Sequence, residues 1–182
     1  MKGMWVGAVA VLVLGFGARQ GSAQEKHKYV SPGQCKSCHT DEKKGDQYGH
    51  WAKSKHAKAF DSLASDQAKE VGKKQTPPID DPQKSEKCLK CHLTEAGLAP
   101  AALADGYEKN KGVGCESCHG PGDDYMDVSV MKDKKKAIEA GLVIPDEKVC
   151  VKCHNKESPT FKEFDYKAAL QKVAHPNPAT KK

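Results

Sequence analysis

Apolar positions are sparse in this chain and gather in one continuous run and two helical stripes. The continuous run covers residues 6–16, close to the N-terminus. The first stripe lies in residues 46–72, where Phe60 and Leu63 follow His56 at helical spacing. The second lies in residues 161–174. The sequence therefore predicts two clear helices, one over 46–72 and one over 161–174.

Capping residues and prolines set the expected limits of these helices. Asp46 is a suitable N-cap, Gly72 a suitable end, and Pro176 stops the second helix. A third, shorter helix is predicted over residues 132–140, ended by Gly141. The segments 73–87 and 97–114 are rich in proline or glycine and are expected to be loops, and no strand is evident. The predicted fold class is mostly α with long irregular loops.

The N-terminal segment has the pattern of an export signal. Lys2 precedes the apolar run, and Gly21, Ser22 and Ala23 supply small residues for cleavage after residue 23. We therefore predict a signal peptide over 1–23 and a single domain over 24–182. The apolar run is short for a membrane span, so no stable membrane insertion is expected after cleavage, although an uncleaved anchor is the alternative. The protein would then be periplasmic or extracellular.

The composition leaves too little apolar surface for an ordinary core. The mean hydropathy is −0.72, and aromatic residues make up 6% of the chain. A chain of this kind buries little apolar side-chain area and would be partly disordered by itself. The interior must therefore be completed by something other than side chains.

The pattern Cys-x-x-Cys-His occurs four times and uses all the cysteines of the chain. It is the attachment motif of haem c, in which two sulfurs bond the porphyrin and the histidine ligates the iron. A disulfide framework, all-cysteine zinc sites and a thioredoxin-like motif are the alternatives, but each leaves the four histidines without a role. We predict four covalently bound haem c groups that form the core of a small multihaem cytochrome c fold. The attachment residues are Cys35, Cys38, Cys88, Cys91, Cys115, Cys118, Cys150 and Cys153, and the proximal ligands are His39, His92, His119 and His154.

Four further histidines equal the number of haems. They are His27, His50, His56 and His175. A second imidazole on each iron would give low-spin haems that only pass electrons, whereas an open position would bind small molecules. His56 is the strongest candidate because it shares a predicted helix face with apolar residues. Met126 and Met131 follow the third motif, but packing is the simpler role for them.

The formal charge of +6 does not indicate nucleic-acid binding. No basic stripe is interleaved with aromatic residues, and the propionates of four haems would offset the lysines. We expect redox partner proteins, of unknown identity, and no nucleic acid. A lysine patch that docks an acidic redox partner fits this charge balance.

Several segments resemble the cytochrome c-554 family of tetrahaem electron carriers. Residues 112–122 (GVGCESCHGPG) are similar to the third haem segment of that family. Residues 35–39 followed by Trp51 and by residues 56–60 (HAKAF) also match, and the fourth motif and His175 come in the expected order. The resemblance implies that His56 ligates the haem of His154 and that His175 ligates the haem of His119.

The chain departs from the family at one ligand. The family has a histidine shortly after the third motif, and Ser129 stands at that position here. The haem of His39 would then take His50 or His27. The second haem of the family has an open site, so the resemblance leaves the coordination of the His92 haem undecided.

These observations favour an exported tetrahaem electron carrier of anaerobic or nitrogen-cycle type respiration, and not an enzyme. Two alternatives stay open. An open haem at the His92 motif could reduce nitric oxide, nitrite or a similar small molecule. The chain could also be a subunit of an extracellular cytochrome filament, a homopolymer in which His27 or His175 reaches the neighbouring subunit.

Overall fold

Short helices joined by long loops make up the fold. The structure is a computed structural model that describes residues 27–177, so the predicted signal peptide over 1–23 lies outside the described residues. The helices are α1 (Pro32–His39), η2 (Glu42–Lys44), α2 (Gln47–Ala52), α3 (Ala59–Ser62), α4 (Asp66–Lys73), α5 (Glu86–His92), η3 (Pro100–Ala102), α6 (Cys115–His119), α7 (Val128–Met131), α8 (Lys134–Glu139), α9 (Glu147–Cys150) and α10 (Tyr166–Val173).

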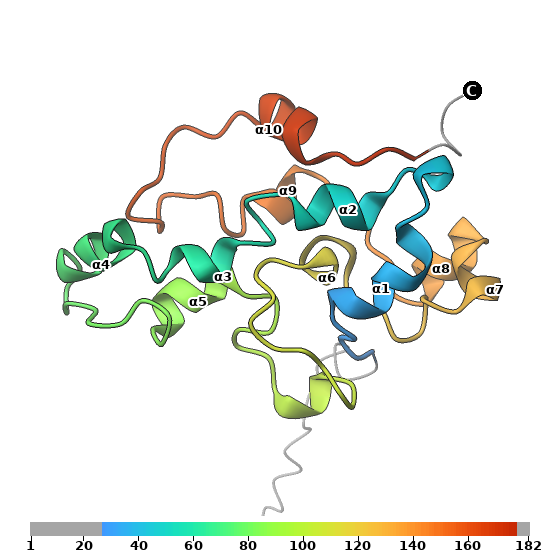
Figure 1. Ribbon diagram of the computed structural model, residues 1–182, viewed down its shortest axis with the longest axis horizontal. Helices are drawn as coiled ribbons and strands as arrows, with labels where there is room; N and C mark the ends of the chain where they lie inside the picture. Colours follow the sequence, from blue (N-terminus) through green and yellow to red (C-terminus); the bar gives the residue numbers. More distant parts are fainter. Residues whose placement is uncertain (1–26, 178–182) are drawn as a thin grey trace, which may run out of the picture.

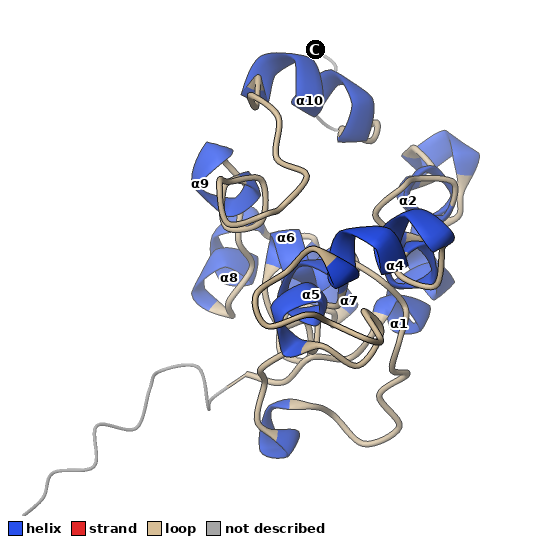
Figure 2. Ribbon diagram, turned by 90° about the vertical axis from the view of Figure 1, so that its left-hand side faces the viewer, coloured by secondary structure: helices blue, strands red, loops and turns tan. Residues whose placement is uncertain are grey.

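Helix α6 lies in the middle of the molecule (Figure 1). It packs against α1, which also packs against α2, while α3 pairs with α5 and α7 with α8. Figures 1 and 2 both place α10 at the edge of the molecule, away from α6. Within residues 27–177 the sole β pairing is an isolated parallel bridge between Tyr29 and Leu103. The predicted fold class, mostly α with long irregular loops, is confirmed.

The prediction of one long helix over 46–72 is wrong, because three short helices occupy that stretch. Asp46 does cap α2 by accepting a hydrogen bond from the amide of Gly49. The chain then leaves the helix, since the hydroxyl of Ser54 accepts from the amide of Ala57, and Ser65 starts α4 as a new N-cap. Serine hydroxyls compete in this way with helical backbone bonds. His56 consequently lies in a turn between α2 and α3.

The other expected elements agree with the structure to within a few residues. The helix predicted over 132–140 is α8, and Gly141 follows it with a φ of 103°. The helix predicted over 161–174 begins later, at Tyr166, because Asp165 caps its first turn. The loops predicted over 73–87 and 97–114 are present, apart from the first residues of α5 and the short η3.

Few large apolar side chains are buried, as the composition predicts. The buried apolar residues of the described chain are Tyr29, Val30, Leu63, Leu93, Tyr125 and Ala137. Such a small set cannot hold a chain of this length together, so the interior fits a protein whose core is built from cofactors. Across residues 27–177, every helix is too short or too polar to span a lipid bilayer.

Candidate haem sites

Each Cys-x-x-Cys-His motif forms a helical turn that ends at its histidine. Helices α1, α5 and α6 end at His39, His92 and His119. In the fourth motif α9 ends at Cys150, and the amide of His154 donates to the carbonyl of Cys150 at 3.0 Å. All eight thiols are free of disulfides. This turn places two sulfurs and an imidazole on adjacent positions, which suits covalent haem attachment.

Hydrogen bonds orient three of the motif histidines. The Nδ1 atom of His92 lies 2.7 Å from the carbonyl oxygen of Ala59, and that of His119 lies 3.1 Å from the carbonyl oxygen of Val143. The Nδ1 atom of His39 lies 3.1 Å from the amide oxygen of Gln47. Because these oxygens only accept, each Nδ1 carries the proton and each Nε2 keeps its lone pair for a metal. Metal-binding histidines are oriented in this way by outer partners.

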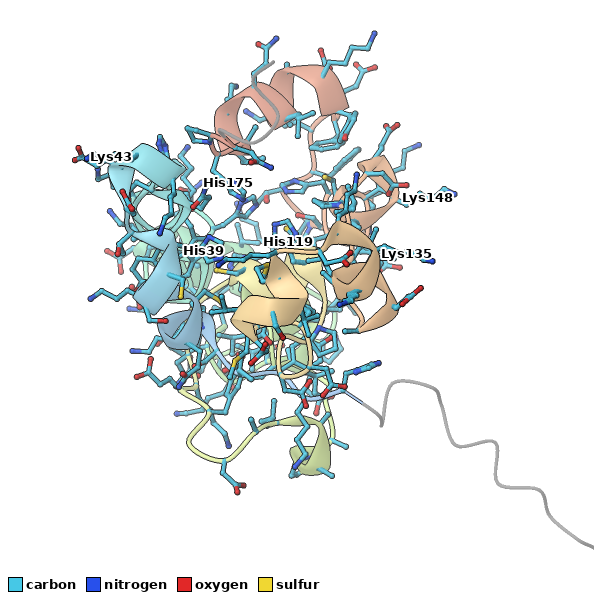
Figure 3. All side chains as sticks on the ribbon, turned by 90° about the vertical axis from the view of Figure 1, so that its right-hand side faces the viewer. His39, Lys43, His119, Lys135, Lys148 and His175 are labelled. Atoms are coloured by element: carbon cyan, nitrogen blue, oxygen red, sulfur yellow. The ribbon has the colours of Figure 1, made fainter. Side chains whose placement is uncertain are left out.

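Two motif histidines face a second histidine at the separation expected across one iron. The ring centroids of His56 and His154 are 6.0 Å apart, and those of His119 and His175 are 5.9 Å apart. Two imidazoles on one metal ion have centroids about 6 Å apart, since each metal–nitrogen bond is about 2 Å long and each centroid lies about 1 Å further out. Figure 3 shows His119 and His175, from different parts of the chain, on the same side of the molecule.

The environments of these second histidines favour the neutral imidazole that binds metals. Burial lowers the pKa of His56, and the nearby His154 lowers it further. Burial also lowers the pKa of His175, followed by the effect of His119. A protonated imidazole has no lone pair to offer, so a lowered pKa extends the pH range in which ligation is possible.

Hydrogen bonds to the third haem segment fix the turn that carries His56. The amide of Val113 donates to the carbonyl of His56 at 2.9 Å, and the indole Nε1 of Trp51 donates to the carbonyl of Val113 at 2.8 Å. Gly112 lies against this turn with a φ of 73°, and a Cβ there would be 2.6 Å from the carbonyl oxygens of His56 and Ala57. A glycine is therefore required where the two segments meet.

His27 and His50 have different surroundings. The Nδ1 atom of His27 lies 2.6 Å from a carboxylate oxygen of Asp124, and Asp123 is also close. His50 is exposed on α2, one turn after Gln47. Within the described residues, neither ring is paired with a motif histidine as those of His56 and His175 are. His39 and His50 both lie close enough to His175 to act on it electrostatically, whereas no histidine ring lies opposite His92 in residues 27–177. The assignment of His27 and His50 to particular haems stays a prediction.

Glu116, inside the third motif, is a structural residue that the sequence analysis missed. Its side chain is 3% exposed and accepts hydrogen bonds from three backbone amides, those of Val30, Ser31 and Gly122. Burial raises the pKa of this carboxyl group. Glu116 thus ties the chain before the first motif to the chain after the third. Its position between two haem-binding cysteines was the sequence feature that could have identified it as a structural residue.

Sulfur atoms of different motifs are neighbours. The side chains of Cys35 and Cys115 are close enough to interact electrostatically, and so are those of Cys91 and Cys153. Cys118 and Cys150 are close enough to interact electrostatically. The first motif therefore adjoins the third, the third adjoins the fourth, and the fourth adjoins the second.

These motifs, their oriented histidines and the helical, loop-rich fold define a multihaem cytochrome of the c type, whose cofactor is covalently attached haem c. The family model for cytochrome c554 and c-prime matches residues 34–120, which include the first three motifs. The cytochrome c-554 of Nitrosomonas europaea is 34% identical over 93 residues, covering 50% of this chain and 37% of the relative. The alignment thus spans little more than a third of that protein.

The solved structure of the reduced state of Nitrosomonas europaea cytochrome c554 matches a longer part of the chain. It has a TM-score of 0.52 and 25% sequence identity, and the match covers 80% of this chain and 78% of that one. The resemblance to the cytochrome c-554 family predicted from residues 112–122 is confirmed.

Proposed function

We propose that this protein is an exported tetrahaem electron carrier in which His56 and His175 complete the coordination of the fourth and third haems. The observation that carries the proposal is the separation of the two histidine pairs, 6.0 Å for His56 and His154 and 5.9 Å for His119 and His175. Two pairs at this separation are unexpected for surface histidines. The periplasm or the cell exterior is the proposed location, since haem c is attached outside the cytoplasmic membrane.

Each group of residues at the haem motifs has a defined role in this proposal. The cysteines of the four motifs would hold the porphyrins, and each motif histidine would supply one ligand to the iron. Haem iron supplies the one-electron chemistry when bound, while the protein fixes ligands, burial and hydrogen bonds that set each potential. Gln47, Ala59 and Val143 orient the proximal imidazoles through Nδ1. In this carrier role the protein transforms no substrate of its own.

The neighbouring cysteines support a continuous order of haem sites. Cys35 and Cys115 link the first and third motifs, Cys118 and Cys150 link the third and fourth, and Cys153 and Cys91 link the fourth and second. The motifs that would hold the haems therefore adjoin in the order first, third, fourth, second. The two ends of this series are the motifs of His39 and His92.

Intact mass spectrometry and visible spectroscopy of the exported protein test the proposal. We expect a mass increase of four haems and a cleaved N-terminus at residue 24. We also expect low-spin spectra for the haems at the third and fourth motifs, without a shift when carbon monoxide is added to the reduced protein. A chain that carries no haem, or carries disulfides instead, would overturn the proposal.

One observation favours a second activity at the second motif. The Nδ1 atom of His92 is bound to the carbonyl of Ala59, yet within residues 27–177 no histidine ring lies opposite His92. An iron with one imidazole keeps a position for a small ligand such as nitric oxide or nitrite. A carbon monoxide shift equivalent to one haem, lost in C88S/C91S together with the second haem, would support this activity, and the absence of a shift would exclude it.

A further inference from the structure

The segment that carries His56 is entirely without acidic residues. Residues 47–60 contain Lys53, Lys55 and Lys58 but no aspartate or glutamate. All three lysines are exposed. In the described chain, no carboxylate lies within ion-pair distance of any of them. Their charges are therefore not offset by side chains of the same protein.

The backbone beneath these lysines is held in place. Val113 and Trp51 attach the turn to the third haem segment, and the hydroxyl of Ser54 accepts from the amide of Ala57 at 3.3 Å. The lysines consequently project from a fixed turn and not from a free loop. A partner that binds this surface would be placed reproducibly with respect to the turn.

The same turn presents a candidate iron ligand. His56 lies between Lys55 and Lys58 in the sequence, and its ring is 6.0 Å from that of His154. His154, like the three lysines, is exposed, so the fourth motif and this turn are both accessible from solvent. A protein docked on the lysines would be separated from this site by little more than the turn itself.

The lysines of α8 offer a useful contrast. Lys134, Lys135 and Lys136 are also consecutive and exposed, but Lys135 lies 3.9 Å from Glu139 and Lys136 lies 3.9 Å from Asp133. Their field is thus partly cancelled by neighbouring carboxylates. Of these two lysine groups, only the turn around His56 combines lysines that have no side-chain carboxylate partner with a candidate iron ligand.

We propose that Lys53, Lys55 and Lys58 form the docking surface for an acidic redox protein that exchanges electrons at the fourth haem site. This inference rests on the proposed carrier function and adds the place of exchange. Opposite charges speed association by steering the partner, and this effect weakens as salt screens it.

Charge reversal in the haem-loaded protein tests the docking surface. The triple variant K53E/K55E/K58E is compared with K134E/K135E/K136E, which changes the net charge equally on α8. The probe is a reduced plant-type [2Fe–2S] ferredoxin, which is acidic and has a potential of about −400 mV. Stopped-flow absorbance at low and high salt gives the second-order rate of electron transfer.

We expect the variant at the turn to react about tenfold more slowly than wild type at low salt and about equally at high salt, because steering is screened. The α8 variant should stay within about twofold of wild type. The neutral variant K53Q/K55Q/K58Q should be intermediate. Carbodiimide should cross-link the ferredoxin to Lys53, Lys55 or Lys58, as mapped by mass spectrometry.

Two results would overturn the docking surface: equal slowing by both charge-reversed variants, or no slowing by the variant at the turn. Failure of the carrier function would look different, because wild type would then accept no electrons from the ferredoxin. Unchanged visible spectra and melting temperatures of the variants exclude misfolding as the cause, since the three side chains are exposed.

Discussion

The third and fourth haem sites have the same motif but different surroundings. At the third, Glu116 is buried and bonded to three amides, and the carbonyl of Val143 orients His119. At the fourth, His154 is exposed and stacks on Phe164 at a ring distance of 4.9 Å. The third site is therefore a structural centre that joins distant segments, whereas the fourth keeps its histidine accessible, as the proposed exchange site requires.

Removal of the thiols should produce the largest contrast between the two sites. We expect C115S/C118S to leave little folded protein, because the third segment carries Glu116 and meets the first motif, and folding is coupled to cofactor binding. C150S/C153S should lose one haem and stay largely folded. Haem content and resistance to limited proteolysis measure both. Equal damage in the two variants would contradict the contrast.

Loss of a second histidine should open one haem at either site. We expect His175→Ala to open the haem of His119, and His56→Ala to open that of His154, since each removes one imidazole of a pair. Carbon monoxide difference spectra should show one additional reactive haem in each variant. Leu170→Ala on α10 is the control, because its side chain is exposed and cannot bind iron. A wild-type spectrum for either variant would show that the histidine pair it changes does not bind one iron.

The carboxylate of Glu116 should matter more than any carboxylate at the surface. Glu116→Ala leaves three backbone amides without their acceptor, so we expect a loss of about 3 kcal/mol in the free energy of unfolding. Thermal or denaturant unfolding of the holoprotein measures this loss. Glu157, which pairs with Lys90 on the surface, provides the control, and Glu157→Ala should not change stability measurably. A stable Glu116→Ala protein would show that the third segment is not a structural centre.

Substitution of Gly112 should have the smallest effect on stability of these variants. Gly112 belongs to the third haem segment, but its substitution should disturb the fourth site, because it contacts the turn of His56. Gly112→Ala adds a Cβ that meets two carbonyl oxygens at 2.6 Å in addition to a φ of 73°, so the turn of His56 must shift. We expect a loss of about 2 kcal/mol or more and a partly high-spin haem.

The matched control for this substitution is Gly106→Ala. Gly106 has a φ of 76° with no atom within 4 Å of the added Cβ, so it carries only the backbone cost of about 1 kcal/mol. Its visible spectrum should be that of wild type. If both variants have the same stability and spectrum, contact between the third segment and the His56 turn does not position the ligand.

The sequence predicted the class of protein better than its helices. Repeated Cys-x-x-Cys-His motifs specify a local chemistry, so haem attachment could be predicted from the sequence, whereas the helical turns that end at His39, His92 and His119 were not. The prediction of one helix over 46–72 failed because the hydroxyls of Ser54 and Ser65 accept hydrogen bonds from the amides of Ala57 and Ala68. The carbonyl of His56 accepts a hydrogen bond from the amide of Val113, which is distant in the sequence, and the spacing of apolar residues cannot predict such a contact.

The outer partners of the site were harder to predict than the ligands. The Nδ1 partners of His92 and His119 are backbone carbonyls, of Ala59 and Val143, and carbonyls leave no signal in a side-chain pattern. Glu116 could have been noticed in the sequence, because a carboxylate between two haem-binding cysteines is in an unusual position for a residue whose charge is exposed. Its three amide donors come from separate segments that only the fold brings together.

An experimental structure of the haem-loaded protein, with its irons located by anomalous scattering, tests the central claim most directly. The account predicts four irons, with one between His56 and His154 and one between His119 and His175. Irons that bind these four histidines separately, or fewer irons than motifs, would contradict it.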